Sequence, residues 1–483
     1  MTCRIRVLPM DIAVQIPRGE NLLSGLRREG FAPDAPCGGS GTCGKCLVKI
    51  DGKWSRACGY TVESDITVEL PPRWDVQIPG NAAPVAVQTN RFQEGRLAAV
   101  DIGTTSVVCS LLSKQGAVLA VRSTTNSQCA YGADVVSRIR LAAEGQGSAM
   151  TAAVRNTVQD LLLGCCADAS TEPGQISQIA LVGNPCMQQL FLGIPVDNLA
   201  RIPFLPAVSR ALALSAGDYL EQFQNALLIT PGNISGFVGA DTVACMIAGE
   251  LYKAEDTVLL VDIGTNGEMV LCHGGRMVAC STAAGPALEG ANISRGMRAE
   301  IGAIDHVFRD GFHVIGDTAP RGICGSGLVD AVAVMLEKKL LNKRGRILTE
   351  DHAYDLAPGV TINQEDIRQV QLAKGAIAAG IRRMTAHLGI TPEHIDRCLL
   401  AGAFGSYMDP RSACRIGLLP PELMGKTRAM GNLALRGAEM LASDRESLAL
   451  AEQIRKETEH LELASMPEFP RSFAKSMTFE EAL

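Results

Sequence analysis

Two long stretches of the chain carry the same succession of apolar runs and turns. LAAVDIGTTSVVCSLLSKQGAVLAV begins at Leu97, and VLLVDIGTNGEMVLCHGGRMVAC begins at Val258. In each stretch an apolar run ends in an aspartate, a DIGT turn follows, and a second apolar run leads through a glycine turn into a third. The pattern predicts three consecutive β-strands in each stretch, and its repetition indicates a duplicated domain.

A different pattern precedes the first repeat. RIRVLP and IAVQIP alternate apolar and polar residues and predict a hairpin, GENLLSGLRREG predicts a short helix, and LVKI and ITVEL predict further strands. Residues 75–96 then contain two prolines, two glycines and no helical period. We expect a linker there, although a loop packed onto its neighbours would have the same composition.

Length and charge narrow the class of protein. A chain of 483 residues with 47% hydrophobic and 20% charged residues predicts two to four globular domains. Its net charge of −6 argues against binding to nucleic acid or to an anionic membrane surface. No signal sequence and no apolar run near the ~18 residues of a spanning helix are visible, so we expect a cytoplasmic protein.

Four of the 16 cysteines lie close together near the start of the chain. Cys37, Cys43, Cys46 and Cys58 have the spacing C-x5-C-x2-C-x11-C on a glycine-rich loop. Such a loop can wrap the sulfides of a [2Fe-2S] cluster and donate N–H bonds to its ligands. A zinc site is the first alternative, but zinc ribbons present two separated knuckles, so we favour iron. The other cysteines fit small buried residues.

The two DIGT turns suit a nucleotide. Glycines allow backbone N–H groups to approach a phosphate, and threonine and asparagine add donors. The candidates are Gly103, Thr104 and Thr105 in the first turn, and Gly264, Thr265, Asn266 and Gly267 in the second. We expect Asp101 and Asp262 to bracket Mg²⁺, which is held by one or two carboxylates together with phosphate oxygens. Glu268 and Glu289 are candidates for orienting water, although both fit salt-bridged residues equally well.

Two further glycine turns follow the second repeat. RCLLAGAFGSY predicts a strand, a turn at Gly402, Ala403 and Gly405, and a helix, an arrangement that admits an adenosine moiety. GICGSGLVDAVAVM places Gly325, Ser326 and Gly327 at a helix N-terminus, where anions are favoured. Each turn fits simple strand–helix packing as well.

These motifs together predict a multidomain chain of α/β and α+β class. The cysteine segment resembles the β-grasp [2Fe-2S] ferredoxins, and the order of phosphate 1, phosphate 2 and adenosine turns resembles the two-lobed ASKHA ATPases, which have an actin-like, RNase H-like fold. We expect a ferredoxin-like domain at 1–74, a linker at 75–96, a first lobe at 97–245, a second lobe with the adenosine turn at 246–447, and a C-terminal helix and tail at 448–483.

The whole chain resembles the reductive activators of corrinoid enzymes. The resemblance is carried by CGGSGTCGKC with Cys58, the two DIGT turns, AAGPALEGA, CGSGL and AGAFGS. It implies a [2Fe-2S] cluster on the four cysteines, ATP and Mg²⁺ at the turns, and ATP-dependent reduction of a cobalt(II) corrinoid protein to cobalt(I) in a methyltransferase system. It also implies an upstream low-potential electron donor and a homodimer.

Two alternatives stay open at this level. An activator of a radical dehydratase also combines an ASKHA fold with iron–sulfur chemistry, but holds one [4Fe-4S] cluster between two subunits, which fits poorly with a complete cysteine quartet. An electron-transfer adaptor that has lost nucleotide fits poorly with two intact DIGT turns. A sugar kinase leaves the cysteines unexplained.

Overall fold

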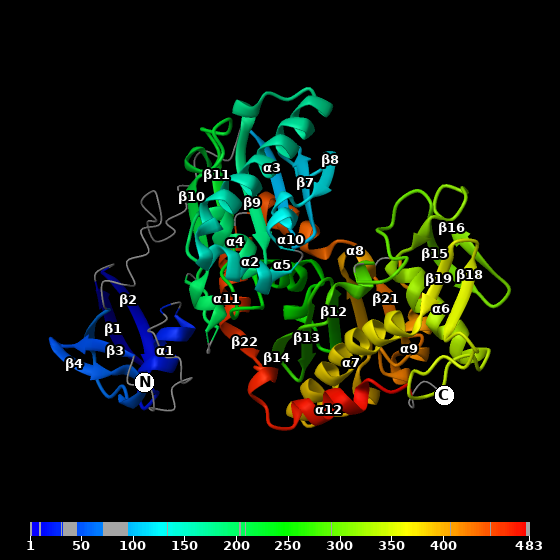
Figure 1. Cartoon of the computed structure of the whole chain (residues 1–483). Coiled ribbons are helices and arrows are strands. Elements are labelled where there is room, and N and C mark those ends of the chain that lie inside the picture. Colours follow the sequence, from blue (N-terminus) through cyan, green and yellow to red (C-terminus); the bar gives the residue numbers. More distant parts are fainter. Residues whose placement is uncertain are drawn as a thin grey trace. The chain divides into compact units, whose positions relative to one another are not determined.

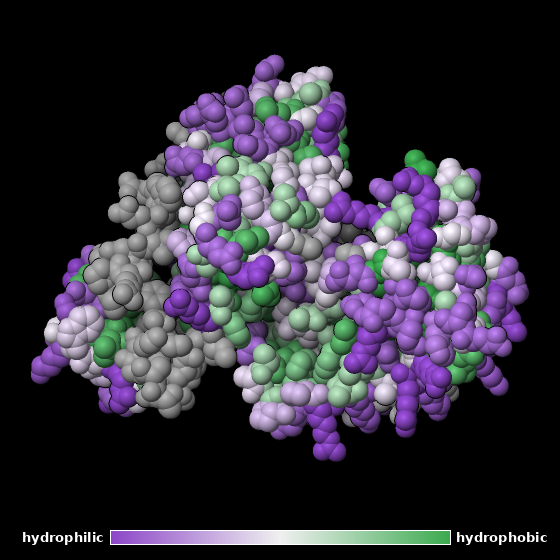
Figure 2. Space-filling model, viewed as in Figure 1, coloured by the Kyte–Doolittle hydropathy of each residue, from purple (hydrophilic) through white to green (hydrophobic). Residues whose placement is uncertain are grey.

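The structure is a computed structural model, and it describes residues 2–8, 11–29, 31, 46–70, 95–132, 134–201, 204–207, 209–290, 292–405, 407–444 and 446–479. The chain divides into two compact units, one of Met1–Ala244 with Gly437–Lys456 and one of Cys245–Arg436 with Glu457–Leu483 (Figure 1). On the face drawn in Figure 2, hydrophilic residues predominate and apolar patches are scattered. Within the described ranges, no helix combines the length and apolarity needed to cross a membrane.

The N-terminal segment forms a five-stranded mixed sheet with one helix. Its strand order is β2-β1-β5-β3-β4, with β1 parallel to β5 and antiparallel to β2. Alternate residues of β1 are buried, because one face of the sheet packs with the helix into a small core. The predicted hairpin, helix and later strands are confirmed. The elements are β1 (Thr2–Leu8), β2 (Ile12–Pro17), α1 (Leu22–Arg28), β3 (Leu47–Ile50), β4 (Lys53–Arg56) and β5 (Ile66–Glu69).

The first DIGT repeat builds a six-stranded sheet of order β10-β11-β9-β6-β7-β8. Three antiparallel strands form the predicted meander, and β9 adds in parallel to β6. The strands are β6 (Arg96–Ile102), β7 (Ser106–Leu112), β8 (Val118–Thr125), β9 (Ile176–Gly183), β10 (Leu212–Ser215) and β11 (Leu227–Thr230). The helices are α2 (Val135–Leu141), α3 (Gly147–Asp168), α4 (Pro185–Leu192), α5 (Ala240–Ala248), α10 (Leu433–Ser443) and α11 (Ser447–Glu457).

The second repeat builds a six-stranded sheet of order β21-β20-β12-β13-β14-β22. Its strands are β12 (Val258–Ile263), β13 (Gly267–His273), β14 (Arg276–Thr282), β20 (Arg397–Ala401), β21 (Thr427–Ala429) and β22 (Thr458–His460). Small sheets are formed by β15 (Ala303–Phe308), β16 (Gly311–Val314) and β17 (Gly322–Ile323), and by β18 (Ala353–Ala357) and β19 (Val360–Asn363). The helices are α6 (Gly325–Glu337), α7 (Gln364–His387), α8 (Gly402–Gly405), α9 (Pro410–Arg415) and α12 (Phe469–Ser476).

The two large sheets share one internal topology, which confirms the predicted duplication. Each has a three-stranded antiparallel meander, and in each the first strand of the meander also pairs in parallel with a later strand, β9 or β20. Apolar residues of both first strands are almost fully buried. Each aspartate of a DIGT motif therefore sits near the end of a buried strand, where the chain turns. The predicted domain boundaries stay predictions.

Candidate functional site

Two of the four predicted cluster cysteines lie in the described residues, and the fold brings them together. Cys46 precedes β3 and is 1% exposed, whereas Cys58 lies half-buried in a 3-10 turn, Ala57–Gly59. The backbone N–H of Cys58 donates to Sγ of Cys46 at 3.5 Å. N–H···S bonds of this kind accompany thiolate ligands of iron–sulfur clusters, so this pair fits such a group. Cys37 and Cys43 lie outside the described residues.

The second DIGT turn gathers several predicted nucleotide residues. Its backbone is closed by the Gly264 N–H donating to the carbonyl of Asn266 at 2.9 Å. Thr265 Oγ1 donates to Glu289 Oε2 at 2.7 Å, so Glu289 reaches the turn from the 3-10 turn Pro286–Glu289. A Cβ atom at Gly264 would lie 3.7 Å from Glu289 Oε1. The turn and Glu289 therefore form one polar group.

Asp262 and Glu268 are direct neighbours across the strand pair. They are register partners in β12 and β13, so their side chains lie on the same face of the sheet. Ser281 Oγ donates to Glu268 Oε1 at 3.3 Å from β14. Together with Glu289, the fold thus brings three of the four predicted catalytic carboxylates to one edge of this sheet.

The carboxyl group of Asp262 has an unusual environment. The pKa of Asp262 is raised to about 6. Burial is the main cause, the Cys245 thiol, which donates to Oδ2 at 3.5 Å, opposes it, and the nearby Glu289 adds to it. A buried carboxylate next to a second carboxylate gains from a cation. Among the residues that the structure describes, no group of three or more histidine, cysteine, aspartate or glutamate side chains is placed to hold a metal ion by itself. Mg²⁺ does not need one, because phosphate oxygens and water complete its shell.

Gly402 brings the predicted adenosine turn against this carboxylate. Ala401 at the end of β20 pairs with Asp262, and Gly402 follows in α8 with a φ of +87°. A Cβ atom at Gly402 would lie 2.5 Å from Asp262 Oδ1 and 2.8 Å from the carbonyl oxygen of Ile263. Glycine is therefore required here by both conformation and space. Ala403 and Gly405 continue the same short helix.

The first DIGT turn has a polar network of its own. Asn126 Nδ2 donates to the Gly103 carbonyl at 2.8 Å, and Asn184 Nδ2 donates to Thr104 Oγ1 at 3.1 Å. The fully buried Arg138 donates from Nη2 to the Thr104 carbonyl at 2.6 Å. Thr105 accepts at its carbonyl from the Asn126 N–H at 2.9 Å. Asp101 ends the buried run of β6 beside this turn.

Sequence reasoning missed four residues of these networks. Asn126, Arg138, Asn184 and Cys245 are 17 to 80 residues distant from the groups that they contact. Asn184 had a local signal, since it caps α4 before a proline. The other three carried no pattern that separates them from ordinary polar or buried residues.

The turn at Gly325, Ser326 and Gly327 begins α6 as predicted. Ser326 is 2% exposed, and its Oγ lies 3.3 Å from Cys324 Sγ. A Cβ atom at Gly327 would lie 2.3 Å from the carbonyl oxygen of Ile304 on β15. Close packing against β15 thus accounts for this glycine, and a role of the turn in nucleotide binding stays a prediction.

Comparison with protein families divides the chain into three parts. Residues 5–69 match the 2Fe-2S iron-sulfur cluster binding domain, a range that includes all four predicted cysteines. Residues 97–254 match the RACo middle region, and residues 256–482 match the C-terminal domain of RACo, the ASKHA domain. The predicted fold class, a [2Fe-2S] ferredoxin-like domain followed by an ASKHA fold, is confirmed.

Individual proteins give the same assignment. The chain is 35% identical over 422 residues to the corrinoid activation enzyme RamQ of Eubacterium limosum, covering 79% of this chain and 70% of the relative. It is 28% identical over 343 residues to the [Co(II) methylated amine-specific corrinoid protein] reductase of Methanosarcina barkeri, covering 63% of each. Among solved structures, a reductive activator for corrinoid, iron-sulfur protein matches with a TM-score of 0.73 and 26% identity over 99% of this chain and 98% of that one. The chain therefore belongs to the family of reductive activators of corrinoid enzymes.

Proposed function

We propose that this chain uses ATP to reduce the cobalt(II) of a corrinoid protein to cobalt(I), with a [2Fe-2S] cluster as the one-electron carrier. The proposal is supported by the names of two relatives, a corrinoid activation enzyme and a cobalt(II) corrinoid protein reductase. The reaction balances with one electron from a low-potential donor and one electron accepted by cobalt(II). We also propose that the protein acts as a homodimer.

The single observation that carries the proposal is that one chain holds both kinds of machinery. The backbone N–H of Cys58 donates to the sulfur of Cys46, and Asp262, Glu289 and Gly402 form a compact acidic group suited to a metal and phosphate. A ferredoxin would need only the first, and a kinase only the second.

Cys46 and Cys58 are two of the proposed ligands of the cluster. Cys46 is supplied by the strand β3 and Cys58 by the adjoining turn, and Asn21 Nδ2 donates to the Cys58 carbonyl at 2.9 Å. These contacts fix the backbone of Cys58 beside the sulfur of Cys46. We propose that Cys37 and Cys43 complete the four thiolates.

The acidic turn defines what the chain does for ATP. We propose that Asp262 holds Mg²⁺, that the N–H groups of Thr265 and Asn266 face the phosphates, and that Gly402 leaves room beside them for adenosine. The Gly264 N–H instead closes the turn by donating to the Asn266 carbonyl. Asp262 and Glu289 gain from a cation, since both carboxylates share one confined region. We propose that Glu268 or Glu289 orients the attacking water.

Nucleotide is needed in this proposal because the electron passes to an acceptor of more negative reduction potential than the cluster. Ferredoxin-like clusters lie near about −400 mV, and each further ~59 mV costs about 1.4 kcal/mol for one electron. ATP can supply this free energy when its binding and hydrolysis change the affinity of the protein for the two oxidation states of its partner.

The test combines the reconstituted, chemically reduced protein with purified corrinoid proteins and follows the absorbance of cobalt(I). We expect cobalt(I) to accumulate with Mg-ATP and to stay at background without nucleotide or with a non-hydrolysable analogue. Equal rates with and without Mg-ATP would contradict the proposal. An EPR signal of a four-iron cluster would instead favour an activator of a radical enzyme.

A further inference from the structure

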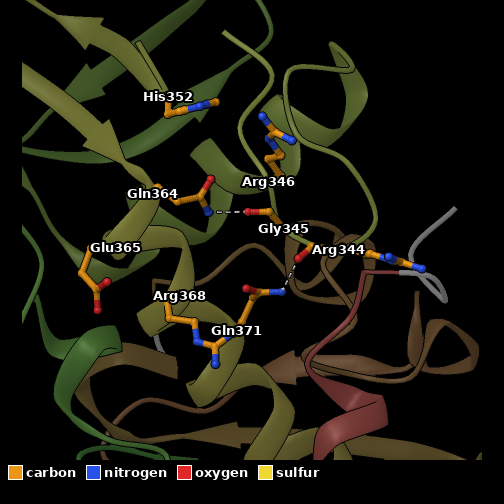
Figure 3. Close-up of a pocket in the computed structure, with 8 residues that line it drawn as sticks. All are labelled: Arg344, Gly345, Arg346, His352, Gln364, Glu365, Arg368 and Gln371. Atoms are coloured by element: carbon orange, nitrogen blue, oxygen red, sulfur yellow. Dashed lines mark hydrogen bonds between the residues drawn. The ribbon is translucent and has the colours of Figure 1, made fainter. Parts of the chain in front are cut away.

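A basic hollow lies in the second unit, away in sequence from the DIGT and adenosine turns. It has a volume of about 550 Å³ and is formed by the loop after α6 and the first turns of α7. Arg344 and Arg346 come from the loop, and Arg368 and Gln371 come from α7 (Figure 3). None of these residues belongs to the nucleotide site proposed above.

The loop of this hollow is held rigidly. Asn342 Oδ1 accepts from the backbone N–H groups of both Arg344 and Arg346 at 2.9 Å. Gly345 has a φ of +82°, and its carbonyl accepts from Gln364 Nε2 at 2.6 Å. Figure 3 shows the amides of Gln364 and Gln371 both reaching loop carbonyl groups. The backbone is therefore organised before any ligand arrives, which lowers the entropic cost of binding.

The floor of the hollow is equally fixed. Gln371 is 5% exposed, and its Nε2 donates to the Arg344 carbonyl at 3.2 Å and to the Met477 carbonyl at 3.0 Å. A Cβ atom at Gly345 would lie 2.5 Å from this amide, so the loop contacts the helix directly. Because this buried amide is held by two hydrogen bonds, the floor of the hollow has a fixed shape.

The positive charges of the hollow have no acidic partner among the residues that the structure describes. The side chains of Arg344, Arg346 and Arg368 are exposed, and none of them has a hydrogen bond or an ion pair with another described residue. Glu365 is the one acidic residue of the lining, and its Oε1 accepts from Gln369 Nε2 at 3.2 Å. The chain as a whole carries a net charge of −6. Three guanidinium groups that line one hollow repel one another, and an anion bound there would lower this repulsion.

We propose that this hollow binds a small molecule with a chain of phosphate groups. Guanidinium groups pair with phosphate oxygens through two parallel N–H···O bonds, and three arginines match the several charges of an oligophosphate. The volume lies in the range of small-molecule sites, whereas an acidic protein segment is recognised on broader surfaces. The same chemistry is offered by a free oligophosphate and by the phosphates of a nucleotide.

The proposal is tested by calorimetric titration of the full chain with inorganic tripolyphosphate, after the nucleotide site has been filled with a non-hydrolysable Mg-ATP analogue. We expect one saturable site, at least tenfold weaker binding in each of R344Q, R346Q and R368Q, and no change in R471Q. Arg471 is an exposed arginine of α12 outside the hollow and serves as the matched control.

Competition experiments distinguish a nucleotide from a free oligophosphate and show which results would contradict the proposal. ATP is added as a competitor to the protein with bound tripolyphosphate. If ATP displaces it at a concentration tenfold lower than tripolyphosphate itself requires, the ligand of the hollow is a nucleotide. If ATP competes less well than that, the ligand is a free oligophosphate. No saturable binding, or equal binding by a variant with all three arginines replaced, overturns the proposal. Binding of hexaglutamate in place of tripolyphosphate also overturns it, in favour of an acidic protein segment. Cobalt(I) formation plays no part in this readout, so a failure of the proposed cobalt reduction and a failure of the hollow to bind phosphate can be distinguished.

Discussion

The carboxyl group of Asp262 is the residue on which nucleotide binding should depend most directly. Burial raises the pKa of Asp262 to about 6, so its proton is retained up to a higher pH than that of an exposed aspartate. A proton and Mg²⁺ compete for the same oxygens, because a neutral carboxyl group is a poor ligand. We therefore expect the binding of Mg-ATP to depend on pH near pH 6.

The first prediction concerns this competition. The affinity for a fluorescent Mg-ATP analogue should be constant above about pH 7 and should fall by roughly tenfold for each pH unit below about 6, since the protonated fraction rises by that factor. D262N should bind weakly at every pH and lose the dependence. An unchanged affinity between pH 5 and 7 would contradict the assignment of Asp262 to the metal.

The second prediction concerns Cys46. C46S should lose the visible absorption and EPR signals of the reconstituted cluster, because an alcohol is a poor ligand for iron in place of a thiolate. The matched control is C3S, since Cys3 is also buried in this sheet, at 5% exposure, and is not among the predicted ligands. Equal cluster content in both variants would remove Cys46 from the ligand set.

At the scale of elements, the strand–turn–helix unit of β20 and α8 lies against Asp262, so in the proposed nucleotide site it would set the space between adenosine and metal. The third prediction is that G402A loses Mg-ATP affinity by at least tenfold, because its Cβ atom would collide with Asp262 Oδ1 and the Ile263 carbonyl. G425A is the matched control: Gly425 has a similar φ of +83° but nothing within 4 Å of an added Cβ atom. Similar losses in both variants would mean that backbone strain alone is responsible.

The packing of the C-terminal segment on α7 supplies the fourth prediction. α12 lies beside α7 (Figure 1), and the chain after it places Phe479 fully buried, with its ring 5.0 Å from Nζ of Lys374. F479A should lower the free energy of unfolding by about 3–5 kcal/mol, the usual cost of removing a buried phenyl group. Urea denaturation of both proteins measures this difference in the free energy of unfolding.

The control for this substitution is F308A. Phe308 is 60% exposed on β15 in the same unit, so its removal should change the free energy of unfolding by less than about 0.5 kcal/mol. A small effect of F479A would show that the C-terminal segment contributes little to this core.

At the scale of the whole molecule, the two kinds of chemistry should fail independently. The fifth prediction is that C46S keeps Mg-ATP affinity, that D262N keeps the iron content, and that both lose cobalt(I) formation by at least a hundredfold. Iron analysis, nucleotide titration and the cobalt(I) assay on the same preparations measure this. Loss of nucleotide affinity in C46S would show that the cluster supports the fold of the whole chain.

The sequence was sufficient to predict the two meanders because their signals are local and repeated, but it did not predict the strand order of the sheets. The DIGT repeats predicted both meanders, and the glycine at 402 predicted the turn that contacts Asp262. Contacts between distant segments had no such signal. Arg138 reaches Thr104 across 34 residues, and Cys245 reaches Asp262 from a helix. Their geometry depends on how distant segments pack together, and neither the hydrophobic periodicity nor the spacing of motifs in the sequence predicts this packing.

The duplicated sheets differ in the charge that each turn provides. Beside the first turn a buried guanidinium, that of Arg138, already holds a backbone carbonyl, whereas Asp262 and Glu289 share the second turn and no described cationic side chain shifts the pKa of Asp262. The first turn therefore has a fixed cation of the chain beside it, and the second has none among the described residues. If the second turn takes its cation from solution as proposed, chelators and divalent salts should affect the second turn and leave the first unchanged.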